Sequence, residues 1–263
     1  MRITVLADNN TYIDHYYLGE PALSFYIEDE DVNILFDTGY SDVFIRNAQS
    51  LGLDLSKITK IVLSHGHNDH TRGLVYFKNQ FLCHNIQLIA HPDAFKERYE
   101  NEKNIGSPLS LMEIESAFKL VLSKEPVSLS ENLTFLGEIP SNIEKRKSIG
   151  LFKNGFPDYV MDDTALAYNT GDGLFIITGC SHSGICNIIE HAKNVCNEKK
   201  VIGIIGGFHL FDVSTQLINT INYFRENQIK KLYPCHCVSF NTKAEIHKFI
   251  PINEVGVGLK IDI

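Results

Sequence analysis

The chain has 263 residues, 44% of them hydrophobic, which is enough to bury a full core. A formal net charge of −8 without a long basic run argues against nucleic-acid binding. Six scattered cysteines with no Cys-x-x-Cys pair, an early acid at Asp8 and no apolar run of spanning length predict a cytoplasmic protein with reduced thiols and no membrane segment.

The first third of the chain predicts alternating strands and helices. Short apolar, β-branched runs indicate strands, and Val43, Phe44, Ala48 and Leu51 recur at helical spacing before Gly52. Ser41 is the expected cap of that helix. The expected strands are 3–6, 23–28, 32–36, 61–63 and 86–90, and the expected helices are 41–51 and about 71–79.

The strand at 61–63 runs directly into Ser64-His65-Gly66-His67-Asn68-Asp69-His70. In an extended chain the side chains at i and i+2 face the same way, so His65 and His67 can turn toward one ion. If a helix begins near Asp69, then Asp69 and His70 face a neighbouring position that can hold a second ion. Imidazole and carboxylate donors suit zinc, with manganese or iron as alternatives. A histidine-rich polar loop is the other interpretation, but four donors at this spacing disfavour it.

The pattern loosens between about residues 93 and 163, which we interpret as an insertion in a single domain spanning 1–263. The charged stretch 96–103 predicts a solvated helix end, and short hairpin strands are expected around Pro126. The basic triplet Lys145-Arg146-Lys147 either meets a substrate phosphate or forms an ordinary solvated loop. His91, at the end of its strand, is better explained as a hydrogen-bonded structural histidine than as a ligand.

Regular alternation returns after the insertion. Gly171-Asp172-Gly173 joins two strands of a hairpin, and a capping box is expected where a helix begins at Thr242. His182, His209 and His236 each follow a strand, so loops at one sheet edge can bring them to the first cluster. The expected strands are 164–168, 174–178, 201–205, 231–233 and 255–261, and the expected helices begin at about 185, 214 and 242.

The metal motif resembles the His-x-His-x-Asp-His signature of the metallo-β-lactamase superfamily. Further stretches resemble a branch of that superfamily that includes dihydropterin ribofuranosyl-aminobenzene phosphate synthases and many metal-dependent hydrolases. They are Ile34-Leu35-Phe36-Asp37-Thr38-Gly39, Thr178-Gly179-Cys180-Ser181-His182-Ser183-Gly184-Ile185, Ile205-Gly206-Gly207-Phe208-His209-Leu210 and Tyr233-Pro234-Cys235-His236-Cys237. The resemblance covers nearly the whole chain outside about 93–163.

This resemblance implies an α/β fold, a four-layer αββα sandwich of the metallo-β-lactamase type. It implies that His182 and His236 join His65, His67, Asp69 and His70 as metal ligands, and that Asp37 supports the metal loop through hydrogen bonds. A turn-forming role of Asp37 is the alternative. His209 is expected to face substrate as a polar or proton-transfer group, and Asp69 to orient the attacking water as well as ligate.

The implied activity is hydrolysis of a small-molecule ester, lactone or phosphoester by metal-bound hydroxide, with one or two ions. One alternative is a pterin-type synthase that joins an aminobenzoate-like amine to its partner with loss of pyrophosphate. Another is a non-catalytic metal-sensing or binding module. The sequence predicts neither the substrate nor the oligomeric state.

Several stretches depart from the pattern of the relatives, and two of these departures concern the metal loop and its ligands directly. Arg72 replaces a small residue beside the metal loop and can hold a substrate anion or pack at the surface. Cys180 stands where many relatives have a bridging aspartate, so it predicts a weak or differently occupied second metal position. A buried cysteine indifferent to metal is the alternative.

Overall fold

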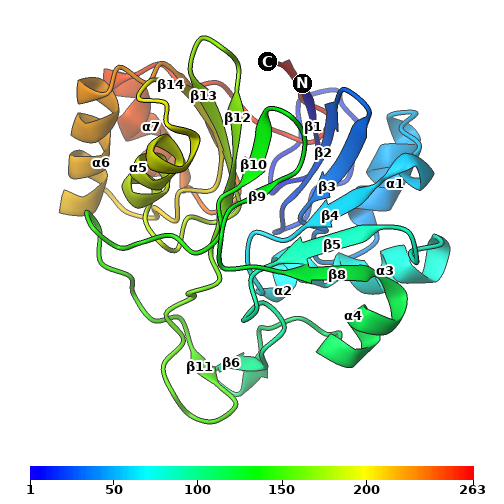
Figure 1. The fold of residues 1–263 in the computed structure, drawn as a ribbon. Coiled ribbons are helices and arrows are strands. Elements are labelled where there is room, and N and C mark those ends of the chain that lie inside the picture. Colours follow the sequence, from blue (N-terminus) through cyan, green and yellow to red (C-terminus); the bar gives the residue numbers. More distant parts are fainter. The chain divides into compact units, whose positions relative to one another are not determined.

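The computed structural model describes all 263 residues, which form two compact units. Unit 1 comprises Met1–Lys124, Ser148–Asp162 and Gly256–Ile263, and unit 2 comprises Glu125–Lys147 and Asp163–Val255. In each unit helices flank a β-sheet (Figure 1), so the predicted α/β class is confirmed. The single domain expected from the sequence stays a prediction.

Unit 1 contains a seven-stranded sheet of order β16-β1-β2-β3-β4-β5-β8. Neighbouring strands from β16 to β3 are antiparallel, whereas β3, β4, β5 and β8 are parallel. Parallel strands end at the same edge, so the residues that follow β3, β4 and β5 gather there. The bounds are β1 Arg2–Ala7, β2 Ser24–Asp29, β3 Val32–Phe36, β4 Lys60–Val62, β5 Gln87–Ala90, β8 Lys119–Leu122 and β16 Lys260–Asp262.

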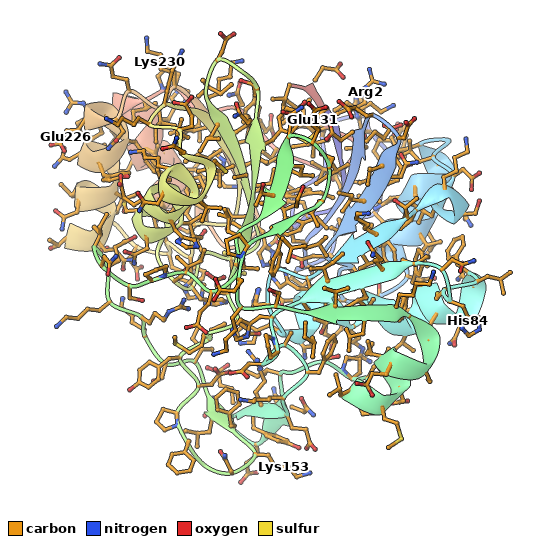
Figure 2. All side chains as sticks on the ribbon, in the orientation of Figure 1. Arg2, His84, Glu131, Lys153, Glu226 and Lys230 are labelled. Atoms are coloured by element: carbon orange, nitrogen blue, oxygen red, sulfur yellow. The ribbon has the colours of Figure 1, made fainter.

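Helices of unit 1 cover the sheet through a buried apolar core, in which the rings of Phe44 and Phe77 stack 6.5 Å apart. A small sheet, β11-β6-β7, lies in the insertion. Lys153 extends from the turn after β11 (Figure 2) and pairs with Glu97 at 2.7 Å. The bounds are α1 Val43–Ser50, α2 Asn68–Thr71, α3 Gly73–Gln80, α4 Leu111–Ala117, the 3₁₀ helix Leu55–Lys57, β6 Arg98–Glu100, β7 Lys103–Asn104 and β11 Leu151–Phe152.

Three local predictions in unit 1 differ from the structure, one of them only at the start of a helix. The charged stretch 96–103 contains β6 and β7 rather than a helix end, because Arg98 points inward and pairs with buried carboxylates. The expected helix at 71–79 is divided into α2 and α3. The final strand is only Lys260–Asp262, since residues from Val255 onward run as loop until they pair with β1.

Unit 2 contains a six-stranded sheet of order β15-β14-β13-β12-β10-β9. Strands β13, β14 and β15 are parallel and the remaining pairs are antiparallel. The carboxyl ends of the three parallel strands therefore deliver their following loops to one edge. The bounds are β9 Val127–Ser128, β10 Leu133–Phe135, β12 Ala165–Asn169, β13 Leu174–Thr178, β14 Val201–Gly206 and β15 Lys231–Pro234.

Helices α5 Ile185–Cys196, α6 Thr215–Glu226 and α7 Phe240–Phe249 pack on this sheet through a shared apolar core (Figure 1). Helix α7 begins two residues earlier than predicted, because Ser239 is the cap and its Oγ accepts the N–H of Thr242 at 3.2 Å. No helix of either unit combines the length and the apolar character that crossing a bilayer requires.

Gly73, the first residue of α3, tests the packing of unit 1. A Cβ at this position would lie 1.8 Å from the carbonyl oxygen of Thr38 and 2.9 Å from the ring of Phe44. We expect Gly73→Ala to lower the free energy of unfolding by about 1–3 kcal/mol or more, because backbone must move. Urea titration measures the free energy of unfolding of each variant. Gly19→Ala is the control, since its Cβ would meet nothing closer than 3.4 Å; equal losses for both variants would contradict this packing.

Candidate metal centre

The loop after β4 brings the rings of His65 and His67 together in unit 1, nearly perpendicular to each other. Nε2 of His65 lies 3.0 Å from Nδ1 of His67, and both side chains are buried. The other ring nitrogen of His65, Nδ1, lies 2.9 Å from Oγ of Ser64. The hydrogen bond to Ser64 thus sets the ring orientation and directs Nε2 toward His67, as in metal sites where a second partner orients the ligand.

Asp69 and His70 form a second donor pair in the same loop. Nε2 of His70 lies 3.5 Å from Oδ2 of Asp69. Nδ1 of His70 lies 2.7 Å from Oδ2 of Asp37, so the two nitrogens of this ring face different carboxylates. The Asp69 carboxylate is 28% exposed, whereas that of Asp37 is fully buried. One of the two carboxylates is therefore accessible to solvent and the other is not.

Asp37 holds the loop through its start as well as through His70. Its Oδ1 accepts the backbone N–H of Ser64 at 2.7 Å, and its Oδ2 accepts the Ser64 hydroxyl at 2.7 Å. Asp37 itself lies directly after β3, the strand that pairs with β4. Parallel strand pairing thereby places the carboxylate beside the loop that it fixes.

The donors of unit 1 fit a divalent transition metal. Two imidazoles and an imidazole–carboxylate pair are ligands that zinc, iron and manganese accept. Burial, together with the nearby charge of Arg98, lowers the pKa of His67 to about 4. His67 is therefore neutral at pH 7, which is the form in which imidazole binds a metal.

Unit 2 gathers a complementary set of donors at the ends of its parallel strands. A ring nitrogen of His236 and Sγ of Cys180 lie within 4.8 Å of each other. The rings of His182 and His209 have centroids 4.4 Å apart. Sγ of Cys237 accepts the backbone N–H of His209 at 3.3 Å. Soft thiol and imidazole donors thus lie together in this unit.

Two hydrogen-bonded side chains shape the loop that carries Cys180 and His182. Oγ of Ser181 donates to the carbonyl of Gly207 at 2.6 Å. The buried carboxylate of Asp163 accepts both the N–H of Ser183 at 2.9 Å and its hydroxyl at 2.5 Å. Burial raises the pKa of Asp163, although Arg146 and the bonds from Ser183 oppose that rise. The loop is therefore tied to the neighbouring strands on both sides of His182.

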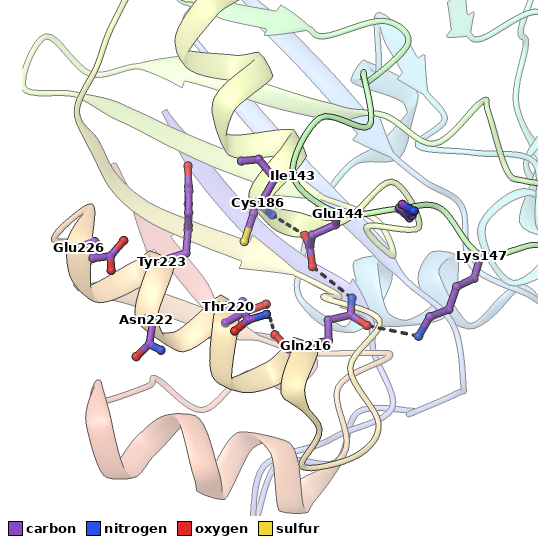
Figure 3. A pocket seen from close by; sticks show the side chains of 11 residues that line it. Ile143, Glu144, Lys147, Cys186, Gln216, Thr220, Asn222, Tyr223 and Glu226 are labelled. Atoms are coloured by element: carbon purple, nitrogen blue, oxygen red, sulfur yellow. Dashed lines mark hydrogen bonds between the residues drawn. The ribbon is translucent and has the colours of Figure 1, made fainter.

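Helix α5, which follows this loop, is capped by a side chain from the segment that contains the basic triplet. Oε2 of Glu144 accepts the N–H of Cys186 at 3.0 Å, and Oε1 accepts Nε2 of Gln216 at 3.2 Å (Figure 3). Lys147 in turn donates to Gln216 at 3.3 Å. The residues that form these bonds line a cavity of about 730 Å³, and none of the predicted metal ligands lines it.

Arg72 and His91 lie outside the donor pairs. The guanidinium of Arg72 donates to the hydroxyl of Tyr40 at 2.7 Å and lies 4.5 Å from its ring centroid. Nδ1 of His91 accepts the N–H of Asp93 at 3.1 Å, a contact typical of a structural histidine. Arg72 is thus held at the end of α2 by an aromatic neighbour.

Arg98 and Asp162 were not predicted as site residues, although Asp162 contacts the metal loop and Arg98 pairs with Asp162. Oδ2 of Asp162 accepts the N–H of Gly66, between the first two histidines, at 2.7 Å. Asp163 of unit 2, which accepts two hydrogen bonds from Ser183, was not predicted either. The available signal was the pair Asp162-Asp163 immediately before a buried strand, a position where unpaired acids are costly.

Comparisons with known proteins identify the family of the chain. A family model described as the metallo-beta-lactamase superfamily matches residues 18–194. A Methanocaldococcus jannaschii protein named 7,8-dihydropterin-6-methyl-4-(beta-D-ribofuranosyl)-aminobenzene-5'-phosphate synthase is 34% identical and aligns over 93% of this chain and 89% of its own. The uncharacterized protein MJ0448 of the same organism is 33% identical over 93% of both chains.

A solved structure is similar over nearly the full length. The crystal structure of Tm1679, described as a metal-dependent hydrolase of the beta-lactamase superfamily, has a TM-score of 0.84 and 30% identity, covering 100% of this chain and 99% of that one. The family model spans more than half of the chain, and the relatives cover it almost completely. The chain therefore belongs to the metallo-β-lactamase superfamily and has its fold.

Proposed function

We propose that the protein is a metal-dependent hydrolase that acts on a small-molecule ester, lactone or phosphoester in the cytoplasm. The observation that carries this proposal is the arrangement of one loop into two donor pairs. Nε2 of His65 lies 3.0 Å from Nδ1 of His67, and Nε2 of His70 lies 3.5 Å from Oδ2 of Asp69. Each pair offers a metal only two donors, so further ligands and open positions for water remain, as catalytic sites require.

We assign the remaining ligands from the pattern of the family. His182 and His236 complete the set, with zinc as the expected metal in one or two positions and manganese or iron as alternatives. Cys180 takes the place of the bridging aspartate of many relatives. A thiolate offers one soft donor where a carboxylate offers two hard oxygens, so the second position favours zinc over manganese.

The chain's own residues then divide the chemistry. A bound metal supplies an activated water near neutral pH and polarises the substrate oxygen. Asp69 orients that water through its partly exposed carboxylate. His209, whose backbone is held by Cys237, delivers a proton to the leaving group. Arg72 binds an anionic part of the substrate from its position against Tyr40.

A synthase is the second candidate, because a relative named as a synthase is 34% identical over 93% of the chain. In that reaction an aminobenzoate-like amine replaces water as the nucleophile, and pyrophosphate leaves. The same donor set serves both reactions, so the nucleophile distinguishes them.

A substrate panel tests both candidates. Protein loaded with zinc, manganese or iron is assayed on a nitrophenyl ester, a lactone and a phosphodiester in ¹⁸O-labelled water. Hydrolysis places one labelled oxygen in the product. A diphosphate ester is assayed as a fourth compound, with and without an added aminobenzoate. Pyrophosphate release from it that requires the amine supports the synthase, and no turnover of any compound by any metal form contradicts the proposed hydrolase.

Metal content tests the ligand assignment. We expect His65→Ala and His236→Ala each to lower the bound metal after reconstitution, because each removes one donor. Elemental analysis of the purified proteins measures the metal-to-protein ratio. His84, on the loop between α3 and β5 (Figure 2), is exposed, and His84→Ala is the control. Native protein that retains no transition metal would contradict the assignment.

The roles of Asp69 and His209 differ in what they affect. We expect Asp69→Ala to lower turnover by about 10²–10⁴-fold, because it removes both a ligand and the group that orients water. His209→Ala should lower turnover while it retains the metal. Kinetics and metal content are measured on the same preparations. A His209→Ala protein without metal, beside an Asp69→Ala protein with metal and full activity, would reverse the two roles.

Cys180 controls the second position in our proposal. We expect Cys180→Asp to strengthen manganese binding relative to zinc, because hard oxygens replace the soft sulfur. Competitive titration of the apo-protein with the two metals measures the ratio. Cys83→Ser, at a buried thiol of unit 1, is the matched control. Two tight sites of unchanged preference in Cys180→Asp would show that the thiol is indifferent to metal.

A further inference from the structure

Three alternate backbone N–H groups fix the extended part of the metal loop. Those of Ser64, Gly66 and Asn68 donate to Oδ1 of Asp37 at 2.7 Å, Oδ2 of Asp162 at 2.7 Å and the carbonyl of Ile105 at 2.8 Å. His65 and His67 are the two residues between these anchors. Because successive residues of an extended chain face opposite ways, anchoring 64, 66 and 68 sets the directions of both histidines.

The middle anchor is a side chain held by an ion pair that is itself buried. Arg98 is 0% exposed, and its Nη2 lies 3.0 Å from Oδ2 of Asp162, the same oxygen that accepts the Gly66 N–H. Nη1 also donates to Oδ1 of Asp162 at 3.3 Å. A two-pronged guanidinium contact restricts the carboxylate more tightly than a single bond does.

Residues of the insertion pack closely against the backbone of the metal loop and against Arg98. A Cβ on Gly66 would lie 2.1 Å from the carbonyl oxygen of Ala94, and one on Gly106 would lie 2.9 Å from Cγ of Arg98. Nη2 of Arg98 also donates to the carbonyl of Asp93 at 2.9 Å. The insertion thus packs directly against the backbone of the metal loop.

Asp162 remains a carboxylate in this setting. Burial alone would raise its pKa, but the charge and hydrogen bonds of Arg98, with the Gly66 N–H, hold the pKa below its ordinary value. Asp158 contacts the same guanidinium, with Oδ2 3.1 Å from Nη1, but burial raises the pKa of this second acid. The side chain of Asp158 forms an ion pair with Arg98 and accepts the N–H of Val160, and neither of these partners lies in the metal loop.

We propose that Asp162, locked by Arg98, is a positioning residue that sets the metal affinity of the His65–His67 pair. This inference rests on the proposed metal-dependent function. The insertion then has a defined role, since it supplies two of the three anchors of the donor loop. Removing an outer partner of a metal site typically weakens binding by about 10–100-fold.

Cobalt titration of the full-length apo-protein tests the proposal. Asp162→Asn keeps the shape of the side chain but loses its charge, and we expect Co²⁺ to bind at least about 10-fold more weakly, with an altered visible spectrum. Asp158→Asn is the matched control, because it removes a charge from the same guanidinium without touching the loop. We expect it to lower the melting temperature but to change Co²⁺ affinity by less than about threefold.

Each outcome has a distinct meaning. If native protein binds no Co²⁺ or Zn²⁺, the proposed function fails and the inference fails with it. If native protein binds Co²⁺ and Asp162→Asn matches Asp158→Asn in affinity and spectrum, only the inference is overturned. Should Asp162→Asn not fold, Asp162→Glu keeps the charge facing Arg98 but moves the acceptor from Gly66. Native-like affinity in Asp162→Glu would then overturn the inference.

Discussion

The buried carboxylate of Asp37 is the contact on which the donor loop depends. It accepts three hydrogen bonds, from the N–H and hydroxyl of Ser64 and from Nδ1 of His70. Its backbone φ is +57°, a conformation that costs about 1–3 kcal/mol in a residue other than glycine. The sheet offsets that cost, because the Asp37 N–H still bonds to Val62 of the neighbouring strand at 2.9 Å. The geometry of the metal loop thus depends on the parallel pairing of β3 with β4, which fixes the position of Asp37.

Unit 2 has the same strained conformation in the loops that carry its candidate site residues. Ser181, His209 and His236 have φ values of +60°, +49° and +53°. Each lies within three residues of the end of a parallel strand, where the chain must turn sharply away from the sheet. Such strain persists only where surrounding contacts over-determine it, as the Ser181 and Cys237 hydrogen bonds do here. The same backbone conformation therefore recurs in three loops that carry candidate site residues.

Strand ends and the spacing of His65 and His67 are local properties, so residue order and periodicity were sufficient for the α/β class and for proposing these histidines as donors. What holds the loop in place could not be predicted in the same way. The burial of Arg98 depends on Asp158 and Asp162, about sixty residues later, and no local pattern separates a buried arginine from a solvated one. The predicted start of α7 was wrong because Ser239 and Thr242 are both residue types that cap helices well, so the sequence did not distinguish them.

The ion pair of Arg98 with Asp162 anchors the loop with two charges of opposite sign, beside a His67 ring whose pKa is lowered chiefly by burial. For His67, the guanidinium charge lowers the pKa and the Asp162 charge raises it, so the two effects oppose each other. An isolated carboxylate at the Gly66 N–H would instead favour the protonated imidazole, which competes with metal binding. An isolated arginine would repel the metal itself. Pairing the two charges therefore lets the insertion fix the backbone of the loop while His67, whose pKa burial lowers to about 4, remains a neutral imidazole.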